Sequence, residues 1–165
     1  MTMILEGKFN LATFTHSDTA NRLKIDNAQL TDEQLESLQK LHELLIHIQG
    51  RLSIKFAKPV QIQINSAYRS AELNKAVKGV PTSQHCKGEA ADTVAVGVPL
   101  DQYFDLLKEL ARDKVLTFGQ VIKEYGSHPE TEKDDWIHVS LFVKGKFENQ
   151  FMIKEQGKPY QHIEL

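Results

Sequence analysis

Residues 83–92 read Ser83-Gln84-His85-Cys86-Lys87-Gly88-Glu89-Ala90-Ala91-Asp92, which is the pattern S-x-H-x-x-G-x-A-x-D. A second imidazole follows in Asp135-Trp136-Ile137-His138, with an acid three positions before it. Two histidines and one aspartate make a three-ligand zinc set that leaves one position open for water. Asp135 is then a spare carboxylate that can serve as a general base. Hydrolysis of a peptide bond by a metal-activated water needs these parts.

The composition is that of an ordinary globular protein. With 165 residues, 41% hydrophobic and 25% charged, we expect a single domain over residues 1–165. The formal net charge of -2 gives no basic field for nucleic acid or anionic membrane. Cys86 is alone, so no intrachain disulfide can form. Neither a signal peptide in residues 1–11 nor a membrane-spanning run is recognisable, so we expect no membrane insertion.

Periodicity predicts an α+β fold. Residues 1–29 lack a clear period and are expected to form an extended arm. Helices are predicted over 31–50, where Thr31 and Gln34 form a capping box and Gly50 ends the helix, over 71–78 and over 99–112. Strands are predicted over 60–65, 90–96, 118–125, 136–143 and 147–153, the last two joined as a hairpin. This order favours an antiparallel sheet with helices packed on one face. The motifs, not the order of elements, place the expected metal site within residues 66–140.

Each candidate ligand also has a simpler interpretation. Asp92 shares a strand face with Val94 and Val96, where a carboxylate is costly unless it is paired or binds a metal; an ion pair with a lysine or arginine would also satisfy it. Bare spacing favours that ion pair. His138 lies on the more polar face of its strand and can point into a cleft, or it can be a solvent-exposed histidine.

The remaining candidates are equally open on spacing alone. Asp135 belongs to a charged run that is usually a solvated turn, and Asp134 is a rival for the role of base. Arg69 ends a strand and can clamp a carboxylate or polarise a carbonyl, or it can form a structural ion pair. His128 is retained as a possible substrate contact. Cys86 has no separate base partner and is interpreted as a bystander.

Together these motifs resemble the zinc D-Ala-D-Ala peptidase family, which includes peptidoglycan carboxypeptidases, VanX-type dipeptidases and some phage endolysins. The resemblance covers about residues 10–145. It includes the segment Ser66-Ala67-Tyr68-Arg69-Ser70, similar to the family's S-x-Y-R-S, and the segment Phe14-Thr15-His16-Ser17-Asp18-Thr19-Ala20 with Ile25-Asp26-Asn27. The family belongs to a wider group with lysostaphin-like and hedgehog-like folds.

The resemblance implies specific roles. His85, Asp92 and His138 would bind one Zn²⁺ ion, Asp135 would be the base, and Arg69 would stabilise developing negative charge. Arg69, Ser83 and Tyr68 would contact the substrate. Several family members carry Glu at the base position, so the Asp is a departure from their pattern.

The implied function is hydrolysis of peptidoglycan peptides, with D-Ala-D-Ala carboxypeptidase action expected first. Cleavage within the stem peptide, as in a phage or prophage endolysin, is the alternative within this class. A non-catalytic, zinc-containing binding module is the alternative outside it. The expected place of action is the bacterial cell wall, reached by a phage-type release because no signal peptide is seen.

Overall fold

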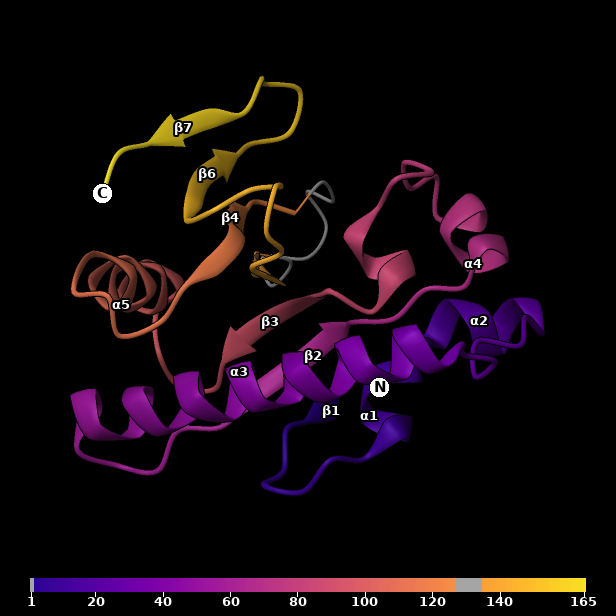
Figure 1. Cartoon of the computed structure of the whole chain (residues 1–165), viewed down its shortest axis with the longest axis horizontal. Helices are drawn as coiled ribbons and strands as arrows, with labels where there is room; N and C mark the ends of the chain where they lie inside the picture. The colour runs from indigo at the N-terminus through magenta and orange to yellow at the C-terminus, as the bar shows by residue number, and fades with distance from the viewer. Residues whose placement is uncertain (1, 127–134) are drawn as a thin grey trace.

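The computed structural model describes residues 2–126 and 135–165. Within that part, the strands form one sheet in the order β1-β2-β3-β5-β4-β6-β7 (Figure 1). The strands are β1 (Met3–Ile4), β2 (Ile62–Ser66), β3 (Ala90–Ala95), β4 (Phe118–Glu124), β5 (Trp136–Leu141), β6 (Gln150–Lys154) and β7 (Gln161–Ile163). The helices are α1 (Leu11–Thr15), α2 (Asp18–Leu23), α3 (Asp32–Phe56), α4 (Ala71–Ala76), α5 (Leu100–Arg112) and the 3₁₀ helix η1 (Gln84–Lys87).

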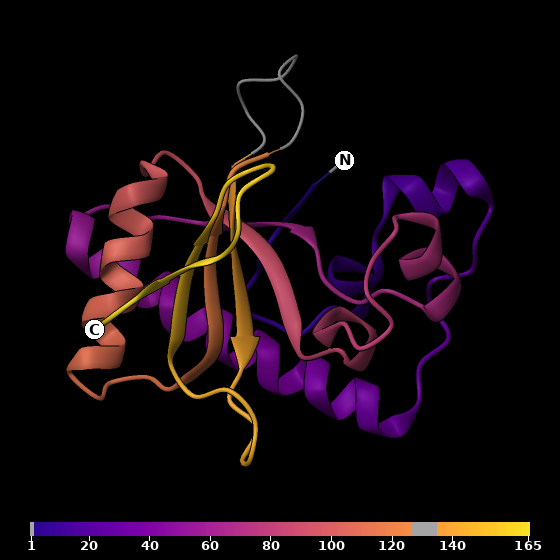
Figure 2. The ribbon, with the colours of Figure 1, turned by 90° about the horizontal axis from the view of Figure 1, so that it is seen from above.

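The predicted α+β class is confirmed. Neighbouring strands pair antiparallel except β4 and β6, which are parallel. Helices α3 and α5 both contact β3 and β5, and Figure 2 shows α5 near one end of the molecule and α2 and α4 near the other. No helix in the described residues is both long and apolar enough to cross a membrane.

Helix α3 begins as predicted but ends later. The Thr31 side chain accepts from the Gln34 backbone while the Gln34 side chain accepts from the Thr31 backbone, so the capping box is present. The predicted stop at Gly50 is wrong, because the helix continues to Phe56. The buried stripe continues past the glycine through Leu52, and its packing outweighs the roughly 1 kcal/mol that a helical glycine costs.

The N-terminal segment is not an extended arm. It contains two short helices, each begun by a side-chain cap: Asn10 accepts from the Ala12 backbone and Ser17 from the Ala20 backbone. Phe14 is fully buried in the core. These helices are too short for a periodic pattern to reveal them, because they form only one to two turns.

The predicted hairpin between residues 136–143 and 147–153 is also wrong. Strand β6 pairs with β4 in parallel rather than with β5. Asn149 accounts for this parallel pairing, because its backbone N–H donates to the Phe118 carbonyl and its side chain accepts from the Phe118 N–H. Both bonds anchor the start of β6 beside the start of β4, so the two strands run in the same direction.

One row of side chains crosses the sheet on the face opposite α3 and α5. Alternate residues such as Ala91, Ile137 and Val121 enter the core under α3 and α5. Their neighbours face the other way. Successive Cα partners in this second set, from β2 to β7, are Ser66, Asp92, His138, Ile122, Met152 and His162. The sheet therefore places two predicted ligands side by side in the middle of one row.

Candidate metal centre

His85 is held rigidly by its backbone and its ring. It lies in η1, where the Ser83 side chain caps the helix by accepting from the His85 N–H. Gly88 ends this turn with φ +71, and an added Cβ would lie 2.8 Å from the Gln34 carbonyl oxygen of α3. The His85 Nδ1 donates to the Ala67 carbonyl at 2.7 Å. This bond fixes the tautomer and leaves Nε2 available as a ligand atom.

Asp92 and His138 meet His85 from adjacent strands. Asp92 on β3 and His138 on β5 are direct cross-strand partners. The Asp92 Oδ1 lies 3.1 Å from His138 Nδ1 and 3.3 Å from His85 Nε2. One ligand atom from each of the three residues lies within 4.8 Å of the other two. The structure thus brings the predicted ligand set together, and His138 is buried rather than solvent-exposed.

The electrostatics of the three residues suit a cation. Burial opposes ionisation of Asp92, but the imidazoles of His85 and His138 outweigh it and hold the pKa of Asp92 well below its usual range. Burial lowers the pKa of His85, which favours the neutral form that binds metal ions. Two imidazole nitrogens and one carboxylate oxygen are donors that zinc accepts. The residues present therefore fit a zinc ion.

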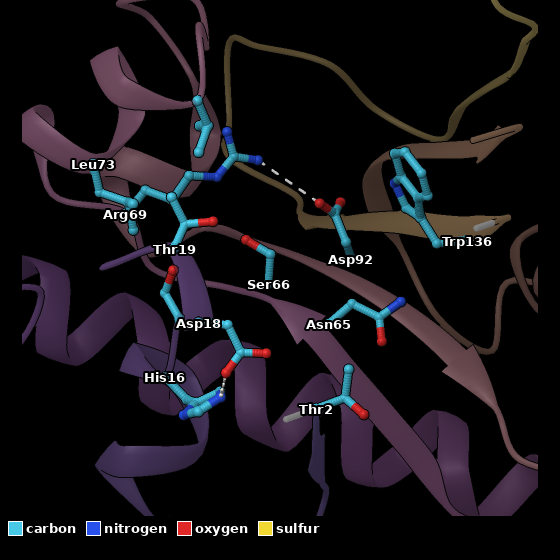
Figure 3. Close-up of a pocket in the computed structure, with 12 residues that line it drawn as sticks. Thr2, His16, Asp18, Thr19, Asn65, Ser66, Arg69, Leu73, Asp92 and Trp136 are labelled. Carbon is cyan, nitrogen blue, oxygen red and sulfur yellow. Dashed lines mark hydrogen bonds and ion pairs between the residues drawn. The ribbon is translucent and has the colours of Figure 1, made fainter. Parts of the chain in front are cut away.

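Arg69 approaches the other oxygen of Asp92. Its Nη2 lies 3.7 Å from Asp92 Oδ2, as Figure 3 shows, and its Nη1 donates to Asn74 Oδ1 at 3.3 Å. The backbone N–H of Arg69 donates to the His85 carbonyl. Gly79 leaves room for this arrangement, because an added Cβ would collide with the Asn74 amide and lie 3.2 Å from Arg69 Nη1.

A cavity of about 410 Å³ opens beside Arg69 and Asp92. Figure 3 shows Arg69 and Trp136 on either side of Asp92, with the His16–Asp18 pair across the cavity. His16 Nε2 and Asp18 Oδ1 are 3.1 Å apart. The lining thus includes four ionisable side chains, those of His16, Asp18, Arg69 and Asp92.

The sequence model of the Peptidase M15 family matches residues 7–140. The chain belongs to the peptidase M15 family. The matched region contains Arg69, His85, Asp92 and His138, so the buried His-Asp-His group is the part of this M15 peptidase that could bind the metal on which such peptidases depend. No curated protein matches the chain.

Asn27 supports the site of this M15 peptidase, and its role was not predicted. Its buried Nδ2 donates to the Thr15 and Tyr68 carbonyls, and its Oδ1 accepts from the Ser70 N–H. These bonds fix the backbone on both sides of Arg69. The sequence offered only the family-like segment around Asn27 as a signal, because the contacts join residues more than 40 positions apart.

Two carboxylates lie at the adjoining ends of β4 and β5. Asp135, the predicted base, is exposed at the start of β5, where its Oδ1 accepts from the Gly126 N–H. Glu124, which was not predicted, ends β4 opposite Trp136 and so lies on the same face as His138. Burial and the negative charge of Asp92 raise the pKa of Glu124 to about 7. Glu124 is not part of any of the sequence motifs that contain the ligands. Only the pairing of β4 with β5 brings it to the site.

The other predicted positions fall in different places. Ser83 caps the turn that carries His85. Tyr68 is buried and its hydroxyl donates to the Gln29 carbonyl, so a substrate contact by Tyr68 stays a prediction. Burial raises the pKa of Cys86, which keeps it a thiol. The predictions for Asp134 and His128 lie outside the described residues.

Proposed function

We propose that this M15 peptidase uses one Zn²⁺ ion, held by His85, Asp92 and His138, to hydrolyse peptidoglycan peptides of the bacterial cell wall. The convergence of His85 Nε2 and His138 Nδ1 on one oxygen of Asp92 carries the proposal. The first expected reaction is removal of the terminal residue from a peptide ending in D-Ala-D-Ala. This substrate follows from the motif resemblance described above.

The zinc ion and Arg69 would both stabilise the negative charge that develops during hydrolysis. When bound, zinc supplies a water of lowered pKa and polarises the scissile carbonyl. The Arg69 guanidinium, oriented by Asn74 and Asp92, stabilises the negative charge that develops on the carbonyl oxygen. The hydrogen bond from His85 Nδ1 to the Ala67 carbonyl keeps the imidazole in its ligand orientation.

We assign the general base to Glu124, with Asp135 as the alternative. Glu124 is half-buried on the sheet face of His138. In the metal-free site, burial and the charge of Asp92 raise its pKa, so Glu124 accepts a proton more readily than an exposed carboxylate does. In this assignment Glu124 takes a proton from the attacking water and gives it to the leaving amine. Asp135 has the exposure of an ordinary surface carboxylate and already accepts a backbone hydrogen bond.

Cleavage inside a peptide is the second candidate. Cavities lie on both sides of the ligand group: one beside Arg69, and another that is lined by Gln84, the residue whose Oε1 lies 3.2 Å from His138 Nε2. An opening on each side is compatible with a chain that passes through the site, as an endopeptidase requires.

Mass spectrometry of digested substrates tests these assignments. Purified peptidoglycan and a synthetic pentapeptide ending in D-Ala-D-Ala are incubated with zinc-loaded wild-type protein and with the Glu124→Gln, Asp135→Asn and His85→Ala variants. Loss of one terminal D-Ala supports the carboxypeptidase, and internal fragments support the endopeptidase. We expect no products from Glu124→Gln or His85→Ala and clear products from Asp135→Asn. Equal activity of Glu124→Gln and wild type would refute the base assignment, and zinc binding without any products would favour a binding module.

A further inference from the structure

A second cavity continues the row of the metal ligands toward the far edge of the sheet. It has a volume of about 450 Å³. Ile122, Met152 and His162 line it, and these residues are the successive cross-strand partners that follow His138 on β4, β6 and β7. Gln84 lies between this cavity and the metal ligands, because it lines the cavity and its Oε1 lies 3.2 Å from His138 Nε2. The cavity therefore adjoins the reaction centre.

Much of this wall comes from outside the family match. The matched region ends at residue 140, before β6 and β7. The later part of the chain supplies five lining residues: Phe147, Gln150, Met152, Tyr160 and His162. In Figure 1 the β6–β7 pair forms the edge of the sheet farthest from β1. The C-terminal strands thus extend the site with residues that the family match does not include.

The chemistry of this cavity differs from that of the cavity beside Arg69. None of its lining residues is a lysine, arginine, aspartate or glutamate. Amide side chains and hydroxyls supply donors and acceptors, and two half-exposed rings, Phe147 and Tyr160, supply apolar surface. His162 adds an imidazole to the lining, and Lys154 Nζ lies 5.0 Å from the centroid of the Tyr160 ring. Such a mixture binds an amide-bearing chain through hydrogen bonds and ring contacts. By contrast, Arg69 on the other side provides the cation that a terminal carboxylate would meet.

The length of this row of cross-strand residues limits how many residues of a substrate peptide can lie along it. From His138 on β5 the row crosses β4 and β6 to reach His162 on β7. Three strand spacings of about 4.8 Å amount to roughly 14 Å. An extended peptide advances about 3.3–3.6 Å per residue, so the row spans about four residues.

We propose that the cavity over β4, β6 and β7 is a substrate subsite for about four residues of a peptide backbone on the acyl side of the scissile bond. This inference rests on the proposed function and adds the direction and length of the bound substrate. The carboxyl-terminal side of the substrate lies over Arg69.

Binding and turnover of a peptide series test the subsite. The probes are acetylated D-alanine oligomers of two to six residues. Affinity is measured by calorimetry with zinc-loaded Glu124→Gln protein, and kcat/KM with zinc-loaded wild-type protein. We expect affinity and kcat/KM to rise at least tenfold in total as the acyl side lengthens to about four residues, and then to level off. In Phe147→Ala and Tyr160→Ala, each placed in both backgrounds, the ratio of long-probe to short-probe values should fall at least fivefold.

One matched control variant tests whether the effect is specific to the cavity. Ile54→Ala removes another exposed apolar side chain, on α3, and should leave the length dependence unchanged. No length dependence, an equal fall of the ratio in Ile54→Ala, a gain only on the amine side, or a gain only when a muramyl sugar is attached would each overturn the subsite. Length-dependent binding without hydrolysis would support the subsite and refute the proposed function, so the two failures are distinguishable.

Discussion

Glu124 should reduce the stability of the metal-free protein at neutral pH. Its pKa is raised to about 7 from an ordinary value of 4.5, because burial and Asp92 disfavour its charged form. The unfolded chain ionises at the lower value. As the pH rises from about 4.5 to about 7, the unfolded state therefore releases its proton first, and the free energy of unfolding falls. Above pH 7 the loss is complete, and below pH 4.5 it is absent.

The size of this effect follows from the displacement of the pKa. Each tenfold change in the proton equilibrium corresponds to about 1.4 kcal/mol, so a shift from 4.5 to about 7 corresponds to about 3 kcal/mol. Solvent screening at this half-buried position reduces the expected value to between about 1 and 3 kcal/mol. Glu124→Gln keeps the shape of the side chain and removes the ionisation, so the variant should be more stable than wild type at pH 8 by this amount.

Thermal unfolding of chelator-treated protein at pH 4.5 and pH 8 measures the difference. About 2–4 °C per kcal/mol is expected for a chain of this length, so Glu124→Gln should unfold at least about 2 °C above wild type at pH 8 and close to it at pH 4.5. Asp135→Asn is the matched control, because it removes an exposed carboxylate at the adjoining end of β5. Parallel pH dependence in wild type and Glu124→Gln would refute the reasoning.

Three further predictions concern Asn27, Gly79 and the pH dependence of zinc binding. Asn27→Ala leaves the Thr15 and Tyr68 carbonyls and the Ser70 N–H without their partner and should lower the free energy of unfolding by about 2–4 kcal/mol in urea titrations; a loss below about 0.5 kcal/mol would contradict the role given to these bonds. Gly79→Ala displaces the Asn74 amide that orients Arg69 and should reduce kcat/KM at least tenfold at unchanged zinc content, so that a parallel loss of zinc would place the damage elsewhere. Acidification should release zinc, because the ligand imidazoles must be neutral to bind it, and zinc affinity that is the same at pH 5 and pH 7.5 would exclude histidine ligation.

Local patterns predicted the individual elements well. The capping box at Thr31 and the alternation around His138 both depend on residues close in sequence, and the structure contains both of them. The motifs offered the three residues that come together as candidates, and the family resemblance, rather than spacing, selected them as a ligand set. Two of them, Asp92 and His138, are brought together by strand pairing, which the spacing alone could not show.

Apart from the two short N-terminal helices, the errors concern contacts between distant residues. The parallel pairing of β6 with β4 depends on Asn149, which hydrogen-bonds to the backbone of Phe118. The sequence pattern of a strand does not show which other strand it pairs with. The same holds for Glu124, whose place beside the ligands depends on the register of β4 against β5. Helix α3 passes Gly50 because a tertiary interface buries Leu52, a contribution that helix propensity does not include.

Zinc titration of metal-free protein, followed by calorimetry, tests the central claim most directly. Wild type and Glu124→Gln should each bind one Zn²⁺ ion per chain with similar affinity. Asp92→Asn, which keeps the shape but removes the charge between the two imidazoles, should bind at least a hundredfold more weakly, with circular dichroism confirming that it is folded. Equal zinc affinity in wild type and folded Asp92→Asn would contradict the assignment of His85, Asp92 and His138 as the metal centre.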